Sequence, residues 1–154
     1  MLKNYISLIV LFSLFINSIA AQYEAVEIPD SNFEQALIDQ GADSYGVIDG
    51  IISYYDYNKI ISLNVSNSNI RSLSGIEFFS NLTYLDCSNN NISSLNGAGG
   101  RDLRTLILRG NKFSTLTIQM DGFSYKLNHI DVSDNPNLTY LYVNTDQDYD
   151  QFTI

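Results

Sequence analysis

One apolar pattern returns three times in this chain and constrains its fold more than any other feature. Each unit carries apolar residues at its positions 1, 4, 6, 11 and 14, and the units begin at Ile60, Leu82 and Leu103. The steps between them are 22 and 21 residues, and all fifteen of these positions are apolar. A repeat of this length predicts a solenoid, in which each unit forms one coil and buries its apolar residues against its neighbours.

Positions 4 and 6 of each unit alternate as inward-facing residues of a β-strand do. We therefore expect strands near 60–65, 82–87 and 103–108. Asn90 and Asn111 follow two of these strands, and Ser68 stands at the same place in the first unit. A buried asparagine amide can bond the backbone groups that a tight turn leaves unpaired, which explains its place in the unit.

The unit resembles the leucine-rich repeat, L-x-x-L-x-L-x-x-N-x-L, over residues 59–146. Residues 75–82 resemble the convex segment and junction of the 22-residue bacterial, internalin-type repeat, and the layout is similar to small exported proteins of Bacteroidetes-like bacteria. The resemblance implies an α/β repeat solenoid. It would be a short right-handed coil with a parallel concave sheet, an irregular or 3-10 convex side and an N-terminal capping helix.

The first 21 residues read as a secretory signal peptide. Lys3 precedes an apolar run at 5–16, and small residues at 18–21 form a cleavage site. The run is shorter than the ~20 residues of a membrane-spanning helix. We expect export to the cell surface or the medium, with the periplasm as a further location, and no membrane insertion after cleavage.

Residues 22–58 have the features of an N-terminal cap and linker. Ser31 and Glu34 form a capping-box pattern, and Phe33, Ala36 and Leu37 lie on one face of a helix expected at about 31–40. This helix would cover the open end of the first coil.

The C-terminal end allows two interpretations. Apolar runs at 127–132 and 138–143 both fit the start of a unit, yet they begin only 11 residues apart, too close for one coil. Either 127–132 is the last concave strand and 138–143 lies on the far side, or the reverse; we favour 138–143 slightly. Residues 147–154 would form an acidic tail.

Composition excludes several functions. With 8 Lys+Arg against 17 Asp+Glu and a net charge of −9, the chain lacks the basic surface that nucleic acids require. One histidine, His129, and one cysteine, Cys87, cannot form a His-rich zinc site or a paired-cysteine motif. The alternating Asp146, Asp148 and Asp150 lack the glycine and the final carboxylate of a calcium loop. We expect no cofactor and no metal.

The outward residues of the expected strands are the candidate binding surface. Aromatic residues on a rigid sheet suit recognition of a surface protein or glycan, although tyrosines can also simply stabilise a sheet. Two alternatives are a structural scaffold or fragment without a ligand, and a glycan hydrolase using Asp86 and Asp131. The residues predicted to bind are Tyr84, Asp86, Thr105, Ile107, Arg109, Tyr140 and Tyr142.

Overall fold

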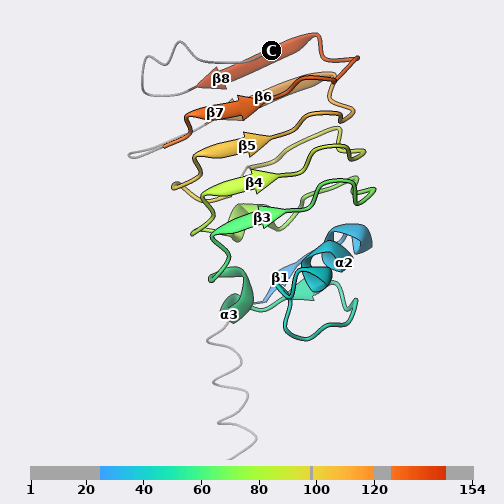
Figure 1. The fold of residues 1–154 in the computed structure, drawn as a ribbon, viewed down its shortest axis with the longest axis vertical. Helices are drawn as coiled ribbons and strands as arrows, with labels where there is room; N and C mark the ends of the chain where they lie inside the picture. Colours follow the sequence, from blue (N-terminus) through green and yellow to red (C-terminus); the bar gives the residue numbers. More distant parts are fainter. Residues whose placement is uncertain (1–24, 98, 120–125, 145–154) are drawn as a thin grey trace, which may run out of the picture.

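The computed structural model describes residues 25–97, 99–119 and 126–144. The predicted signal peptide and acidic tail lie outside these residues. The described chain winds into a stack of coils, and successive coils each add one short strand to a parallel sheet (Figure 1). This front sheet has the order β3-β4-β5-β7 and consists of β3 (Ser62–Asn64), β4 (Tyr84–Asp86), β5 (Thr105–Ile107) and β7 (His129–Asp131). The expected leucine-rich-repeat coil is confirmed.

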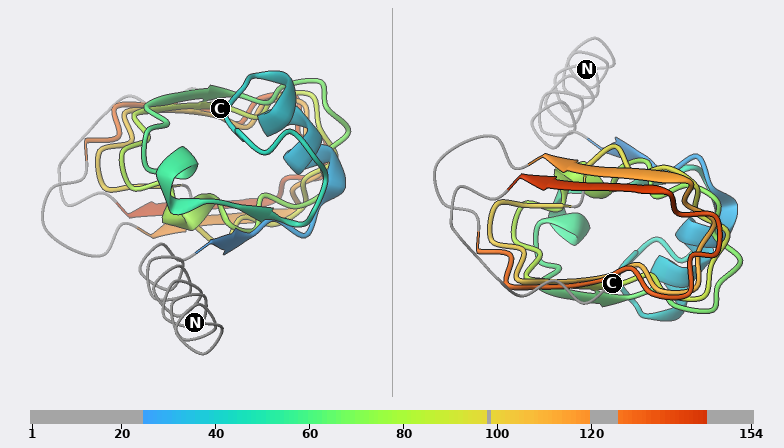
Figure 2. Two further views of the ribbon diagram at one scale, coloured as in Figure 1. Left: turned by 90° about the horizontal axis from the view of Figure 1, so that it is seen from below. Right: turned by 90° about the horizontal axis from the view of Figure 1, so that it is seen from above.

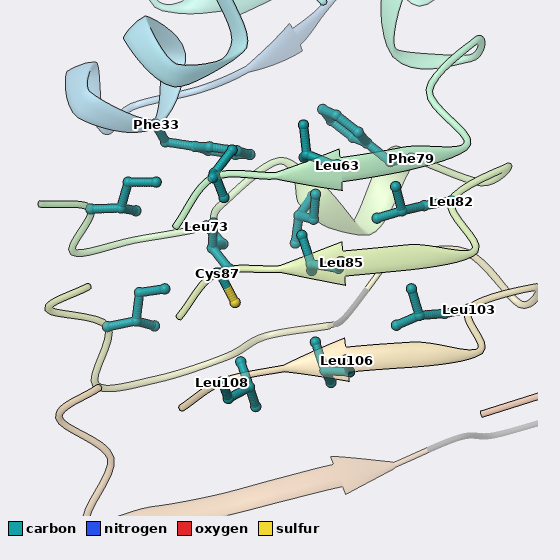
Figure 3. Packing of buried hydrophobic residues seen from close by; sticks show 14 of the residues in the cluster. Phe33, Leu63, Leu73, Phe79, Leu82, Leu85, Cys87, Leu103, Leu106 and Leu108 are labelled. Carbon is teal, nitrogen blue, oxygen red and sulfur yellow. The ribbon is translucent and has the colours of Figure 1, made fainter. Parts of the chain in front are cut away.

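The repeat keeps its apolar residues in line across the front sheet. Leu63 pairs with Leu85, Leu85 with Leu106, and Leu106 with Ile130. All four are at most 2% exposed. Figure 3 shows Leu63, Leu85 and Leu106 stacked along the axis of the coil. Because side chains alternate along a strand, the residues on either side of this line point outward from the coil.

A second, two-stranded parallel sheet lies on the opposite side of the coil (Figure 2). This rear sheet consists of β6 (Thr115–Gln119) and β8 (Tyr140–Asn144). In the first coil the same side carries only the 3-10 helix η1 (Ile76–Phe78). The convex side is therefore more regular than expected in the last two coils.

The rear sheet corrects our preference for 138–143 as the last concave strand. That assignment is wrong, because β8 pairs with β6, whereas β7 extends the front sheet beside β5. The partner of Leu141 is Leu116, which occupies position 14 of the third unit. The run at 138–143 is thus the returning half of the fourth coil, and its L-x-x-L-x-V spacing imitates the start of a unit.

The N-terminal segment closes the lower end of the stack (Figures 1 and 2). It comprises β1 (Val26–Glu27), α2 (Ser31–Asp39), β2 (Ile51–Ile52) and α3 (Tyr54–Tyr57). Phe33 of α2 is fully buried and stacks on Phe79 of the first coil, with ring centroids 6.4 Å apart. This contact continues the apolar core from the coils into the cap.

Asp30, rather than Ser31, is the N-cap of α2. Its Oδ1 accepts the backbone N–H of Asn32 at 2.9 Å, and its Oδ2 accepts those of Arg71 and Ser72 at 2.7 and 2.9 Å. Glu34 does not complete a capping box, since its Oε1 accepts the N–H groups of Asp49 and Gly50 instead, both at 2.8 Å. One carboxylate thus begins the helix and fastens it to the first coil.

Candidate functional site

Two rows of outward side chains cross all four strands of the front sheet. The pairing register sets Ser62, Tyr84, Thr105 and His129 side by side in one row. The other row is Asn64, Asp86, Ile107 and Asp131. We call these eight residues the front face. Neighbouring strands lie ~4.8 Å apart, so each row is a line of closely spaced side chains on a fixed backbone.

A ladder of buried asparagines fixes the turns that follow the strands. Asn111 is fully buried; its Oδ1 accepts the N–H of Ile92 at 3.0 Å, and its Nδ2 donates to the carbonyls of Cys87 and Leu108 at 3.0 and 2.9 Å. Asn90 and Asn135 make the same type of bonds one coil before and one coil after. Each amide therefore joins two adjacent coils, and the front strands cannot shift independently.

Side chains of the second row also bond the turns. Oδ1 of Asp86 accepts the backbone N–H of Ser88 at 2.9 Å, and Oδ1 of Asp131 accepts that of Ser133 at 2.9 Å. Asn64 makes the equivalent bond in the first coil. These short-range bonds favour one side-chain conformation for each residue, so the polar groups of this row are ordered before any ligand binds.

Arg109 follows β5, at the place where the other coils have a serine. Its Nη2 lies 2.6 Å from Oδ2 of Asp134, and both side chains are more than half exposed. An exposed pair of this kind contributes little to stability. It places one charge pair at the end of the front face.

Two groups of the front face have shifted pKa values. Burial, and then the charge of Asp86, raise the pKa of the Tyr84 hydroxyl. For Asp131, partial burial opposes ionisation, but the hydrogen bonds from Ser133 and the charges of Arg109 and His129 together hold its pKa below the usual range. The front face therefore carries an ionised carboxylate at Asp131 and a neutral phenol at Tyr84 near neutral pH.

The structure brings together five of the seven predicted binding residues. Tyr84, Asp86, Thr105 and Ile107 lie in the two rows, and Arg109 lies just beyond β5. Tyr140 and Tyr142 do not join them, because they belong to β8 of the rear sheet, where they are 55% and 44% exposed.

His129 and Asp131 take the places that were assigned to the two tyrosines. Neither residue was among the predicted binding residues, because 138–143 was favoured as the fourth strand of the concave sheet. The sequence does contain a signal that identifies 127–132 as the strand. Asn135 follows Leu127 by the same number of residues as Asn111 follows Leu103. Asp86 and Asp131 share a row, with Ile107 between them.

Other site types find little support in residues 25–97, 99–119 and 126–144. No group of three or more His, Cys, Asp or Glu side chains is placed there to hold a metal ion. Cys87 is fully buried, and burial raises the pKa of its thiol, so it behaves as a core residue. Within these ranges no helix has both the length and the apolar character to cross a membrane.

Comparisons with known proteins agree with this geometry. Residues 81–99 match the Leucine Rich Repeat family profile. The functional domain of InlJ from Listeria monocytogenes, described as including a cysteine ladder, is similar over 77% of this chain, with 29% identity and a TM-score of 0.54. An internalin, inlF, from the same organism is similar over 76%, with 18% identity and a TM-score of 0.51. This chain spans 28% and 44% of those two structures. A search of curated proteins finds no match.

Proposed function

Because this chain is a bacterial leucine-rich-repeat protein of the internalin type, we propose that it is an exported, non-catalytic recognition module that binds a surface protein or glycan through its front face. The observation that carries the proposal is the pairing register of the front sheet. It sets Tyr84, Ile107 and the polar residues around them in two straight rows on a backbone fixed by buried asparagines.

The chemistry of the front face suits recognition. Tyr84 and Ile107 offer apolar contact area at a low cost in side-chain entropy, since strands and turns already hold them in place. Thr105 and His129 lie beside them and offer hydrogen bonds to a ligand. A rigid surface of this composition loses little conformational freedom on binding, which favours affinity.

The size of the front face limits the partner. Four strands at ~4.8 Å spacing span ~15 Å, so the front face is well below the ~800 Å² that each partner contributes to a standard stable interface. Binding through these residues alone would be weak or would use flanking surface. The ion pair of Arg109 and Asp134, just beyond the ends of β5 and β7, offers a polar extension of the front face.

Export rests on the first 21 residues. The positive charge at Lys3, the apolar run at 5–16 and the small residues at 18–21 support secretion or display at the cell surface. Mass spectrometry of the protein from culture medium should give a mature chain that begins at Ala21 or Gln22. A chain that keeps residues 1–20 would contradict this part of the proposal.

The two sheets supply a matched pair of variants for the binding test. Tyr84→Ala/Ile107→Ala removes two side chains from the front face, and Tyr140→Ala/Tyr142→Ala removes two from the rear sheet. Each protein is immobilised and exposed to surface extracts of neighbouring cells, after circular dichroism and urea unfolding establish that it is folded. We expect a partner that the wild type and the rear variant retain and the front variant loses. Equal capture by all three proteins would contradict the proposal.

A further inference from the structure

Resting on the proposed function, we propose that the partner of the front face is a cationic polypeptide segment. The segment would place two basic side chains on either side of an apolar one, over Asp86, Ile107 and Asp131. These three residues lie side by side in one row of the sheet, on β4, β5 and β7.

The spacing of this row defines the ligand. The two carboxylates are separated by one intervening strand, so their backbones lie about 10 Å apart, at twice the usual strand spacing. Ile107 fills the place between them and is only partly buried. A lysine or arginine stem can pack on such an apolar side chain while its charged head reaches a carboxylate.

The two carboxylates are ordered in advance. In each, Oδ1 is held by the backbone N–H two residues further on, and Asp131 also accepts the Ser133 hydroxyl at 2.6 Å. Oδ2 of either residue accepts no hydrogen bond from the described part of the chain. One oxygen of each carboxylate therefore remains available to an incoming cation, at little cost in side-chain entropy.

Among the described residues, no cation forms an ion pair with Asp86 or Asp131. Arg109 pairs with Asp134 at 2.6 Å, and Arg104 interacts with Asp102, which also accepts a hydrogen bond from Lys126 at 2.6 Å. Arg109 and His129 contribute to keeping Asp131 ionised. The chain as a whole has a net charge of −9, which attracts a basic partner at long range.

A helical peptide provides a defined probe of this row. Residues four apart on a helix are separated by ~6 Å along its axis, close to the ~4.8 Å between strands. The basic probe is an 18-residue peptide, ~27 Å long as a helix, with Lys, Leu and Lys at positions i, i+4 and i+8 in an otherwise neutral sequence. The control peptides replace both lysines by glutamine or by glutamate.

The test compares two double variants with the same change in net charge. Asp86→Asn/Asp131→Asn removes the two carboxylates and keeps Oδ1 as an acceptor for the turn. Glu27→Gln/Glu77→Gln removes two exposed charges beside η1, on the side of the coil that carries the rear sheet. Titration calorimetry at low salt should show basic-peptide affinity about five- to tenfold weaker for the first variant, and changed by less than about twofold for the second.

Three results would overturn the inference. The first is an equal loss of basic-peptide affinity in both double variants, which would indicate attraction to net charge alone. The second is that the glutamine peptide binds the wild type as tightly as the basic peptide does. The third is that the basic peptide does not bind the wild type. The proposed function is assessed separately, with the partner captured from surface extracts. If that partner is lost with Tyr84→Ala/Ile107→Ala but retained with Asp86→Asn/Asp131→Asn, the front face binds and the cationic assignment fails.

Discussion

The front and rear sheets share one core but differ in how they are built. Every coil that the structure describes adds a three-residue strand to the front sheet, and buried asparagines fix the turns that follow. The rear sheet has longer, five-residue strands, yet only the last two coils form it. The front sheet is therefore the more regular of the two, although its strands are shorter.

The difference lies in what orders each sheet. On the front side, side-chain amides satisfy the backbone groups of each turn and connect it to the next coil, so the register repeats without interruption. On the rear side, Leu138, Leu141 and Val143 are only partly buried. The front sheet is thus held in a fixed register. On the rear side Leu116 and Ile118 of β6 are buried, and β8 is the less fully packed strand.

The two sheets should differ most in the stability that is lost when a core leucine is replaced by alanine. Leu106→Ala on β5 removes a fully buried side chain and should lower the free energy of unfolding by about 4 kcal/mol. Leu141→Ala on β8 removes a half-buried one and should cost about 1.5 kcal/mol. Equilibrium urea unfolding measures both. Equal losses of unfolding free energy would mean that the two sheets contribute alike to stability.

The asparagine ladder should give the next largest effect. Asn111→Ala leaves the buried N–H of Ile92 without a partner and should cost about 2 kcal/mol. The carbonyls of Cys87 and Leu108 lose one donor each but keep the amides of Asn90 and Asn135. Asn91→Ala, at an exposed side chain in the turn before, should change stability by less than about 0.5 kcal/mol. If the two substitutions cost the same, the ladder does not order the front sheet.

The smallest effect concerns pH. The pKa of Asp131 is lower in the folded chain than the ~3.9 of an unfolded aspartate, so its contribution is present above that value and is lost as pH falls through the folded pKa. Asp131→Asn should cost under about 1 kcal/mol at pH 7 and have a smaller effect at pH 3. Urea midpoints at both pH values measure this. An equal cost at both would show that the ionised carboxylate does not stabilise the front turn.

The sequence predicted the front sheet better than the rear one for a physical reason. Leu63, Leu85 and Leu106 repeat at nearly constant steps because each must pair with the next. The rear sheet has no such constraint in the first coil, where η1 takes its place. The sequence therefore contains no repeated spacing that predicts the rear strands. Tyr140 and Tyr142 were misplaced because the half-coil at 138–143 has the same apolar spacing as a strand at the start of a unit.

The cap shows a second limit of sequence reasoning. The amphipathic pattern located the helix, now seen as α2, but not the contacts of its carboxylates. Asp30 and Glu34 bond N–H groups of residues far along the chain, in the first coil and near Asp49. Local capping patterns contain no information about such partners, because the fold alone brings them together.

Site-specific photo-crosslinking tests most directly whether the front face contacts the partner. A benzophenone amino acid replaces Tyr84 on the front face or Tyr142 on the rear sheet, and each protein is irradiated with surface extracts of neighbouring cells. Both positions are tyrosines in strands, so the two proteins differ mainly in the side of the coil that carries the probe. We predict a covalent adduct from position 84 and none from position 142. An adduct from position 142 alone, or equal adducts from both, would contradict recognition through the front face.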